Sequence, residues 1–218
     1  MNELQKLLIP KKLNPKYVKR RFGVQDYDGG YILIDNLDFT DNTILGFGVD
    51  GDYSCELQLQ EQYPGDVHLY DGTVDVVCKE KNVYFHKQNI TPYNINEIFD
   101  NFKKITFKMD IEGHEYGAFH FLSENNLKKI VQMSIEFHWP EQKHISIFNK
   151  INETHKIFHV AANNCCGIMS NGIPTCFEIS YINREYCDIE EIDDSEYPTH
   201  LDRMNTNLRP WPLLFKWW

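Results

Sequence analysis

Ionisable side chains gather at the end of an apolar run in residues 105–116, which read ITFKMDIEGHEY. Asp110, Glu112, His114 and Glu115 follow one another closely there. Burying carboxylates without partners costs free energy, so we expect these groups to face a cleft and a ligand. The stretch is interpreted as the catalytic edge of a sheet, with Asp110, Glu112 and His114 as candidate catalytic residues.

A second apolar run, residues 130–138 (IVQMSIEFH), also ends in polar groups, Glu136 and His138. The carboxyl ends of parallel strands meet at one edge, which predicts that both lie beside Asp110. In one mechanism a side chain takes a proton directly, and His138 leads because imidazole titrates near neutral pH. In the other, Asp110, Glu136 and His138 hold a divalent metal ion. The direct base is favoured over the metal, since no compact ligand motif defines a coordination geometry.

Structural roles remain open for several of these residues. Glu112 and Glu115 suit the first turn of a helix, where acids interact favourably with the helix dipole. His114 has an alternative role as a surface helix residue. His159, inside a later apolar run, is expected to be a hydrogen-bonded core histidine.

A glycine-bearing turn comes earlier in the chain. The apolar run 42–47 (NTILGF) leads into GVDGDYS and a helix expected over 52–62, with Asp52 or Ser54 as its cap. The next strand, 67–70, ends at Asp71, where a dinucleotide-type fold places the acid that holds ribose hydroxyls. The alternative is that Asp71 only begins the turn DGT.

Strands and helices alternate through the rest of the chain. Further strands are expected over 82–89, 105–110, 130–138, 158–162 and 176–182, and helices over 93–102, 113–125 and 144–154. The last strand follows a loop short enough for an antiparallel return. The pattern predicts an α/β fold: an open, seven-stranded, Rossmann-like, mostly parallel sheet with one antiparallel strand and helices on both faces.

The 218 residues are expected to form one domain, 1–218, with an N-terminal arm or helical cap over 1–21. Residues 185–218 combine an acidic surface loop with an aromatic tail that is predicted to pack on the domain or to make a homo-oligomer. Gly29 and Gly30 form a turn into strand 31–34, which is interpreted equally as a hairpin corner or as a ligand loop, and Asp28 beside it is a secondary site candidate.

The formal net charge of -10 argues against nucleic acid or an anionic membrane as the main partner. The basic run 11–21 is interpreted as a solvated arm in preference to a polyanion site. Six cysteines without a CxxC pair predict reduced thiols. With no signal peptide or membrane-length apolar run, a cytoplasmic location is expected.

Several blocks resemble known methyltransferases. FKMDIEGHEYGAF resembles the KxDxEGxE signature of FkbM-type methyltransferases, and QMSIEFHW resembles the strand that follows it there. DYDGGYILID, ILGFGVDGDYSCELQL with HLYDGT, and HVAANN with FEISYINR resemble further blocks of related methyltransferase-like proteins. The resemblance covers about residues 20–184 and extends to the class I S-adenosylmethionine-dependent fold, whose seven strands end in an antiparallel hairpin.

The resemblance implies S-adenosylmethionine as the cofactor. Gly46, Gly48, Asp50 and Ser54 would line its methionine and ribose side, Asp71 would bind the ribose diol, and Gln88 and Asn89 would lie near adenine. The chain departs from the usual first motif, since GFGVDGD has Phe47 between the first two glycines.

The predicted function is O-methyl transfer to a sugar or another small hydroxylated acceptor. An NAD(P)-dependent oxidoreductase is the second hypothesis, weakened because the glycines do not form GxGxxG and the last strand returns as a hairpin. A catalytically silent binding protein with this fold is the third.

Overall fold

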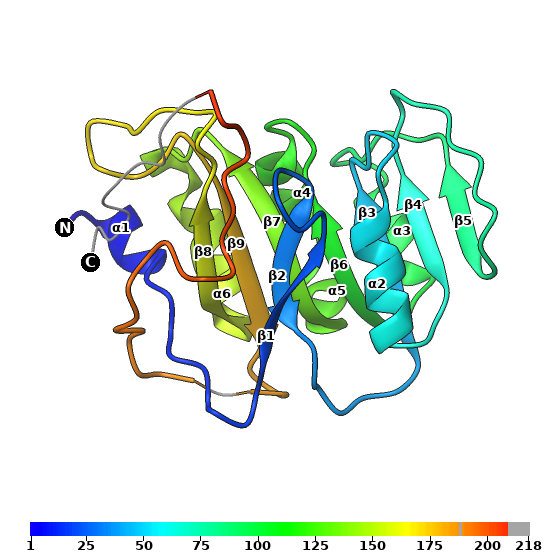
Figure 1. The fold of residues 1–218 in the computed structure, drawn as a ribbon, viewed down its shortest axis with the longest axis horizontal. Coiled ribbons are helices and arrows are strands. Elements are labelled where there is room, and N and C mark those ends of the chain that lie inside the picture. Colours follow the sequence, from blue (N-terminus) through cyan, green and yellow to red (C-terminus); the bar gives the residue numbers. More distant parts are fainter. Residues whose placement is uncertain (188, 209–218) are drawn as a thin grey trace.

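The computed structural model describes residues 1–187 and 189–208, and its centre is a seven-stranded sheet of order β5-β4-β3-β6-β7-β9-β8 (Figure 1). The strands β3 to β7 are parallel to one another, and β9 is antiparallel to both β7 and β8. This confirms the predicted fold class. The strands are β3 (Asn42–Phe47), β4 (Val67–Tyr70), β5 (Val83–His86), β6 (Lys104–Met109), β7 (Ile130–His138), β8 (His155–Ala162) and β9 (Cys176–Asn183).

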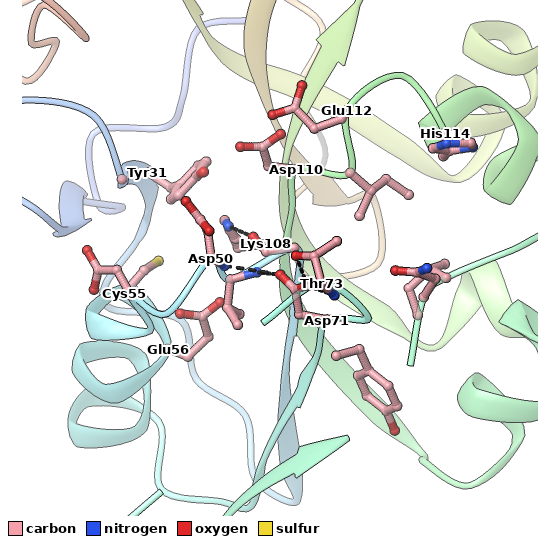
Figure 2. Close-up of a pocket in the computed structure, with 18 of the residues that line it drawn as sticks. Tyr31, Asp50, Cys55, Glu56, Asp71, Thr73, Lys108, Asp110, Glu112 and His114 are labelled. Carbon is pink, nitrogen blue, oxygen red and sulfur yellow. Dashed lines mark hydrogen bonds between the residues drawn. The ribbon is translucent and has the colours of Figure 1, made fainter. Parts of the chain in front are cut away.

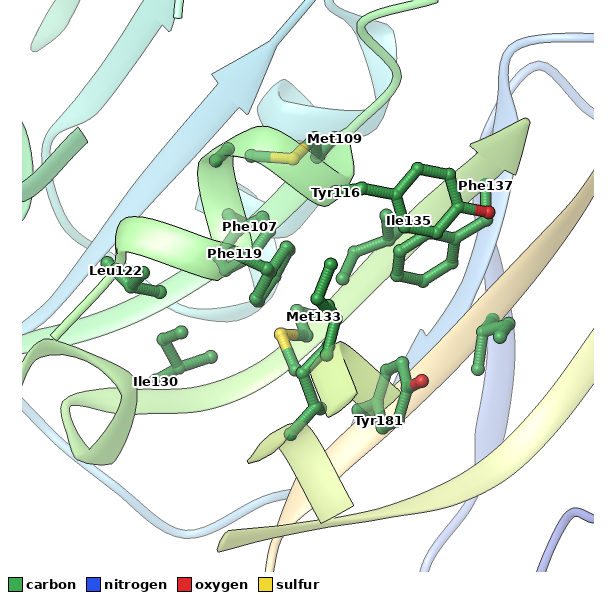
Figure 3. Close-up of a cluster of buried hydrophobic side chains, with 14 of the residues drawn as sticks. Phe107, Met109, Tyr116, Phe119, Leu122, Ile130, Met133, Ile135, Phe137 and Tyr181 are labelled. Atoms are coloured by element: carbon green, nitrogen blue, oxygen red, sulfur yellow. The ribbon is translucent and has the colours of Figure 1, made fainter. Parts of the chain in front are cut away.

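Helices cover the sheet on both faces. One face carries α1 (Glu3–Leu7), α3 (Ile95–Asp100), α4 (Glu115–Phe121), α5 (Glu124–Lys128) and α6 (Ile145–Thr154), preceded by the 3-10 turn η1 (Gln142–His144); the other carries α2 (Ser54–Gln62). Figure 3 shows the larger core, where Phe107, Phe119 and Phe137 meet. Every residue of β7 and β9 is buried, as expected of strands covered on both sides.

A separate two-stranded hairpin, β1 (Lys19–Gly23) and β2 (Gly30–Ile34), lies beside α2 (Figure 1). Buried polar groups attach it to the main sheet: the Ile34 N–H donates to Gln132 at 2.9 Å, and the Ser180 hydroxyl donates to the Ile32 carbonyl at 2.6 Å. Of the two interpretations of the Gly-Gly turn, the hairpin corner is present, since β1 and β2 are antiparallel, and Asp28 and Gly29 also line the pocket described below. The interpretation of residues 11–21 as a solvated arm is wrong for Arg21, which is buried.

Several predicted boundaries shift. The helix expected over 113–125 divides into α4 and α5, because Leu122 takes an extended conformation and the Ser123 side chain caps α5. The N-cap of α2 is Tyr53, which makes no side-chain cap hydrogen bond, so neither Asp52 nor Ser54 caps this helix. The Asp52 carboxylate accepts from the Ser54 N–H instead.

The acidic segment after β9 is not only a solvated loop. Asp193 is buried and accepts hydrogen bonds from Ser195 and from the Tyr197 hydroxyl, so it organises the segment. The aromatic tail, residues 209–218, lies outside the described residues, and its predicted packing is untested. The six cysteines, all within the described part of the chain, form no disulfide bonds with one another. No helix of the described chain has the length and apolar composition needed to cross a membrane.

Candidate functional site

A pocket of about 780 Å³ opens at the carboxyl ends of β3, β4 and β6 (Figure 2). The glycine-bearing loop after β3 forms one wall, and residues 110–112 after β6 form the opposite wall. Tyr31, from the hairpin, and residues 89–92, after β5, complete the lining. The two stretches singled out in the sequence therefore face one cavity, at the switch point where open α/β sheets bind ligands.

Gly48 allows the two walls to touch. Its φ is +71°, and a Cβ at this position would lie 1.7 Å from the carbonyl oxygen of Asp110. The Asp110 N–H donates to the Phe47 carbonyl at 2.9 Å. Only glycine fits a backbone contact of this kind, because any side chain would separate β3 from the loop after β6.

Asp71 lines the pocket and also shapes its glycine loop. One carboxylate oxygen accepts from the backbone N–H groups of Val49 and Asp50, both at 3.1 Å, and the other accepts from the N–H and hydroxyl of Thr73 at 2.7 and 2.6 Å. Burial acts to raise the pKa of Asp71, but these hydrogen bonds outweigh it and lower the pKa. A ribose diol would have to share oxygens that already accept protein hydrogen bonds.

Lys108 is a pocket residue to which the sequence analysis assigned no role. It is 5% exposed, its ammonium lies 5.1 Å from the centre of the Tyr31 ring, and it donates to the Gly48 carbonyl. A signal was present, because Lys108 and Asp110 alternate with apolar residues and so share one face of the strand.

Glu56, on α2, was also missed. It is 1% exposed and lines the pocket, and its Oε1 has no hydrogen-bond partner among the described residues. Burial raises its pKa to about 7, although the charge of Lys108 acts in the opposite direction. Gly46 leaves room for it, since a Cβ there would lie 2.2 Å from Oε1. Gly46 does not line the pocket itself, but its lack of a side chain leaves space for Glu56. The polar sequence of α2 gave no indication that Glu56 would be buried.

Asp110 has the properties of a base. Burial and the charge of Glu136 raise its pKa to about 7, and its Oδ1 has no hydrogen-bond partner among the described residues. Glu112 projects beside it from a backbone with φ of +55°, and its side chain is largely exposed. A carboxylate that titrates near neutral pH and keeps an unpaired oxygen can accept a proton from a ligand.

His138 lies behind this rim and is held by Glu115. The Glu115 carboxylate, which is fully buried, lies 3.3 Å from His138 Nδ1 and accepts from the Ile111 and Gly113 N–H groups. Burial acts to lower the pKa of His138, but Glu115, followed by Glu136 and Asp110, raises it to about 9. The imidazole is therefore protonated at neutral pH, which argues against the predicted base role. Glu115 fastens the loop before α4 and is more than a first-turn acid.

Glu136 is enclosed by side chains of β8 and β9. It accepts from Asn163 at 2.9 Å and from the Cys176 thiol at 2.6 Å, and burial raises its pKa. The predicted metal set of Asp110, Glu136 and His138 is not among the sets of described residues whose ligand atoms all lie within 4.8 Å of one another. Those sets are Asp110–Glu112–His138, Glu136–His138–Cys176 and Asp28–Glu136–Glu178.

The other predicted residues divide between the pocket and its surroundings. Asp28, Asp50, Asn89 and His114 line the pocket, and Asn89 accepts from the Gly72 N–H at 3.1 Å. Ser54 and Gln88 do not line it. His159 is buried with its Nε2 2.8 Å from Asp202, as expected of a paired core histidine.

Comparison with known proteins finds no matching family model and no matching curated protein. Similar solved structures include a putative haemolysin from Streptococcus thermophilus (12% identity, TM-score 0.40, 73% of this chain and 64% of that one). Another is a precorrin-6y C5,15-methyltransferase from Geobacter metallireducens, with 8% identity and a TM-score of 0.39 over 67% of this chain and 84% of that one. A third is a putative DNA modification methyltransferase from an Escherichia coli prophage, with 11% identity and a TM-score of 0.39 over 74% of this chain and 52% of that one.

The chain thus spans under two thirds of the haemolysin. At these identities and TM-scores, neither an activity nor a substrate is transferred to this chain. The resemblance to FkbM-type proteins stays a prediction.

Proposed function

We propose that this chain is an S-adenosylmethionine-dependent methyltransferase that methylates a hydroxyl oxygen of a sugar or a similar small acceptor. The observation that carries the proposal is the charge of the pocket. Seven carboxylates line it, against one lysine whose ammonium already donates to Gly48. The seven are Asp28, Asp50, Asp52, Glu56, Asp71, Asp110 and Glu112.

Charge separates the two cofactor hypotheses. S-adenosylmethionine carries a positive sulfonium and an ammonium group, whereas NAD(P) carries a negative pyrophosphate. A pyrophosphate next to this row of carboxylates would be repelled, while a sulfonium would be attracted. The sheet order and the antiparallel last strand agree with the fold that the sequence resemblance implies.

The residues present fit such a cofactor. Glu56 Oε1 and Asp110 Oδ1 are buried acceptors without a partner among the described residues, as expected where a cationic ligand supplies the counter-charge. The glycine loop and Glu56 would hold the cofactor against the end of β3. When bound, it supplies a methyl group on a positively charged sulfur, which makes that carbon susceptible to attack by an oxygen.

The acceptor hydroxyl must lose its proton as it attacks. Asp110, with a pKa of about 7 and a free oxygen, takes that proton as the general base. The protonated His138 stabilises the carboxylate form of Asp110 by its charge. Glu112 and His114 lie at the same wall and offer hydrogen bonds to further hydroxyls of a sugar-like acceptor.

Calorimetry tests the cofactor. We expect S-adenosylmethionine and S-adenosylhomocysteine to bind, and NAD to give no heat of binding. Glu56→Gln should weaken S-adenosylmethionine about tenfold, or about 1.4 kcal/mol, because it removes a buried countercharge. Glu61→Gln, on the same helix but outside this pocket, is the matched control and should bind like the wild type. Tight NAD binding would overturn the proposal.

Transfer of a labelled methyl group to a panel of sugars tests the reaction. Turnover that survives exhaustive chelation supports the direct base, whereas its loss points to a metal at one of the sets that share His138. Cofactor binding without turnover on any hydroxylated acceptor would favour the catalytically silent binding protein.

A further inference from the structure

A second hollow, of about 470 Å³, is lined by residues of the hairpin strand β1 and of α2 and shares no lining residue with the acidic pocket. Three arginines line it: Arg20 and Arg21 from β1, and Arg203 from the segment after the acidic loop. Gln25, Gln58 and Leu201 complete the lining, and Glu61 is the one carboxylate that the described residues contribute to it. Three guanidinium groups around one hollow are unexpected in a chain of net charge -10.

None of the three arginines forms an ion pair within 4.0 Å with a carboxylate of the described residues. Other cations of the chain do find such partners, for example Lys19 with Asp193 and Arg184 with Glu190. Glu61 in the lining and the buried Glu178 near Arg21 offset only part of this positive charge, and the like charges repel one another, so the arrangement favours an anion from outside the chain.

The guanidinium groups are held in place by neutral contacts. Arg21 donates to the carbonyls of Val24 and Tyr27 at 2.8 and 2.6 Å, and Arg203 donates to the carbonyls of His200 and Asp202, both at 2.7 Å. The Arg20 guanidinium lies 4.8 Å from the centre of the Phe22 ring.

These contacts leave donors unused. A guanidinium has five N–H donors, and the hydrogen bonds of Arg21 and Arg203 to backbone carbonyls occupy only some of them. Arginine forks that are already positioned suit phosphate oxygens, which they bind by paired hydrogen bonds.

We infer that the hollow between β1, α2 and the 199–203 segment is a binding site for a phosphate-bearing small molecule, separate from the methyltransferase pocket. Arg20 and Arg203 contact the phosphate oxygens, and Arg21 sets the shape of the hairpin turn. Gln25 and Gln58 line the hollow as neutral groups whose amides hydrogen-bond to the backbone of β1. The hollow holds more than one phosphate group, so a diphosphate or a phosphate ester fits it better than inorganic phosphate. The basic run of the sequence thus contributes two residues to a defined site.

Calorimetry with inorganic pyrophosphate and with inorganic phosphate, at constant ionic strength, tests this site in the full chain. We expect pyrophosphate to bind more tightly than phosphate, and the affinity to fall as salt rises. Arg20→Gln and Arg203→Gln should each weaken pyrophosphate about tenfold. Glu61→Gln should strengthen it, since it removes the one carboxylate of the hollow. Arg21 is left unchanged, because its loss would disturb the hairpin.

Arg184→Gln is the matched control: this arginine is partly exposed, is paired with Glu190 and lies outside the hollow, so the variant should bind pyrophosphate like the wild type. Pyrophosphate binding should also persist in saturating S-adenosylhomocysteine, which keeps this test independent of the proposed methyl transfer. The inference is overturned if pyrophosphate gives no heat of binding, or if the Arg20→Gln/Arg203→Gln double variant binds it like the wild type.

Discussion

Asp110 combines the two properties that the proposed reaction requires of its base, a position in the pocket and a pKa near neutral pH. It lines the pocket and keeps an unpaired oxygen, and burial together with Glu136 raises its pKa to about 7. His138, the base expected from its ordinary pKa, is protonated because Glu115 lies against it. In the proposed reaction, therefore, Asp110 is the proton acceptor in place of His138.

Asp110→Asn should lower turnover at least about a hundredfold, because the amide cannot take the hydroxyl proton. S-adenosylhomocysteine affinity, measured by calorimetry, should change little. In the wild type, turnover should rise with pH through about 7, as Asp110 loses its proton. A pH profile that stays flat across this range would contradict the assignment.

The same substitution should stabilise the fold at alkaline pH. Because the folded pKa of Asp110 exceeds the unfolded one, the wild type loses stability as pH rises from about 4 to about 7. Asp110→Asn lacks this loss and should be more stable than the wild type by about 1 to 3 kcal/mol at pH 8, with a smaller gain at pH 5. Urea denaturation at the two pH values measures the difference.

At the scale of elements, the loop between β3 and α2 depends on two neighbouring strands. Asp71, after β4, accepts hydrogen bonds from its backbone, and Lys108, on β6, donates to its Gly48 carbonyl. The loop after β6 closes against Gly48 itself. Residues on or after three parallel strands, β3, β4 and β6, therefore hold this wall of the pocket in place.

Two glycine substitutions in this loop separate crowding from backbone strain. Gly48 and Gly51 have similar φ angles, +71° and +83°, but only Gly48 faces a backbone atom where a Cβ would lie, and Gly51 has nothing within 4 Å. Gly51→Ala should cost about 1 kcal/mol for its left-handed conformation, and Gly48→Ala about 3 kcal/mol or more, because β3 and the loop after β6 must move apart. Urea denaturation of both variants checks the order, and equal losses would show that the contact is unimportant.

At the scale of the whole molecule, the segment after the acidic loop closes over β8 and the hairpin. His159 Nε2 lies 2.8 Å from Asp202, the Asn205 amide donates to Asp28 at 2.8 Å, and the Thr206 N–H donates to Asn164 at 3.0 Å. The segment carries Arg203 into the basic hollow and supports Asp28 at the acidic pocket. Two pockets of opposite charge therefore share the hairpin as a wall.

Asp202→Asn should destabilise the fold by about 2 to 4 kcal/mol at pH 7, because it leaves the buried His159 without its charged partner. Burial acts to raise the pKa of Asp202, but His159 and Thr199 outweigh it and lower the pKa, so this stabilisation is present above about pH 4 and is lost as pH falls through the lowered pKa.

Hydrogen exchange should quicken in the amides of residues 199–207 in this variant. Asp194→Asn, at an exposed acid paired with Lys12, is the control and should leave stability nearly unchanged. Unaltered exchange in Asp202→Asn would show that the segment is held in another way.

The sequence by itself determined the seven strands, the alternation of helices and the meeting of the two pocket walls. Apolar runs and glycine turns are local signals, and the carboxyl ends of parallel strands must share an edge. Asp110, Glu112 and His114 line the pocket as these signals predict, and Gly48, Asp50 and Asn89 line it as the family resemblance implies.

Only the tertiary structure decided the charge states and the burial of polar groups. Elements distant in the chain bury Glu56, Lys108 and Arg21. The pKa of His138 is raised by the Glu115 carboxylate beside it, so the imidazole keeps its proton at neutral pH. A pKa depends on all nearby charges and on the loss of water, which residue spacing does not reveal. For the same reason the sequence did not reveal that Arg20 and Arg21 of the basic run line one hollow with the distant Arg203.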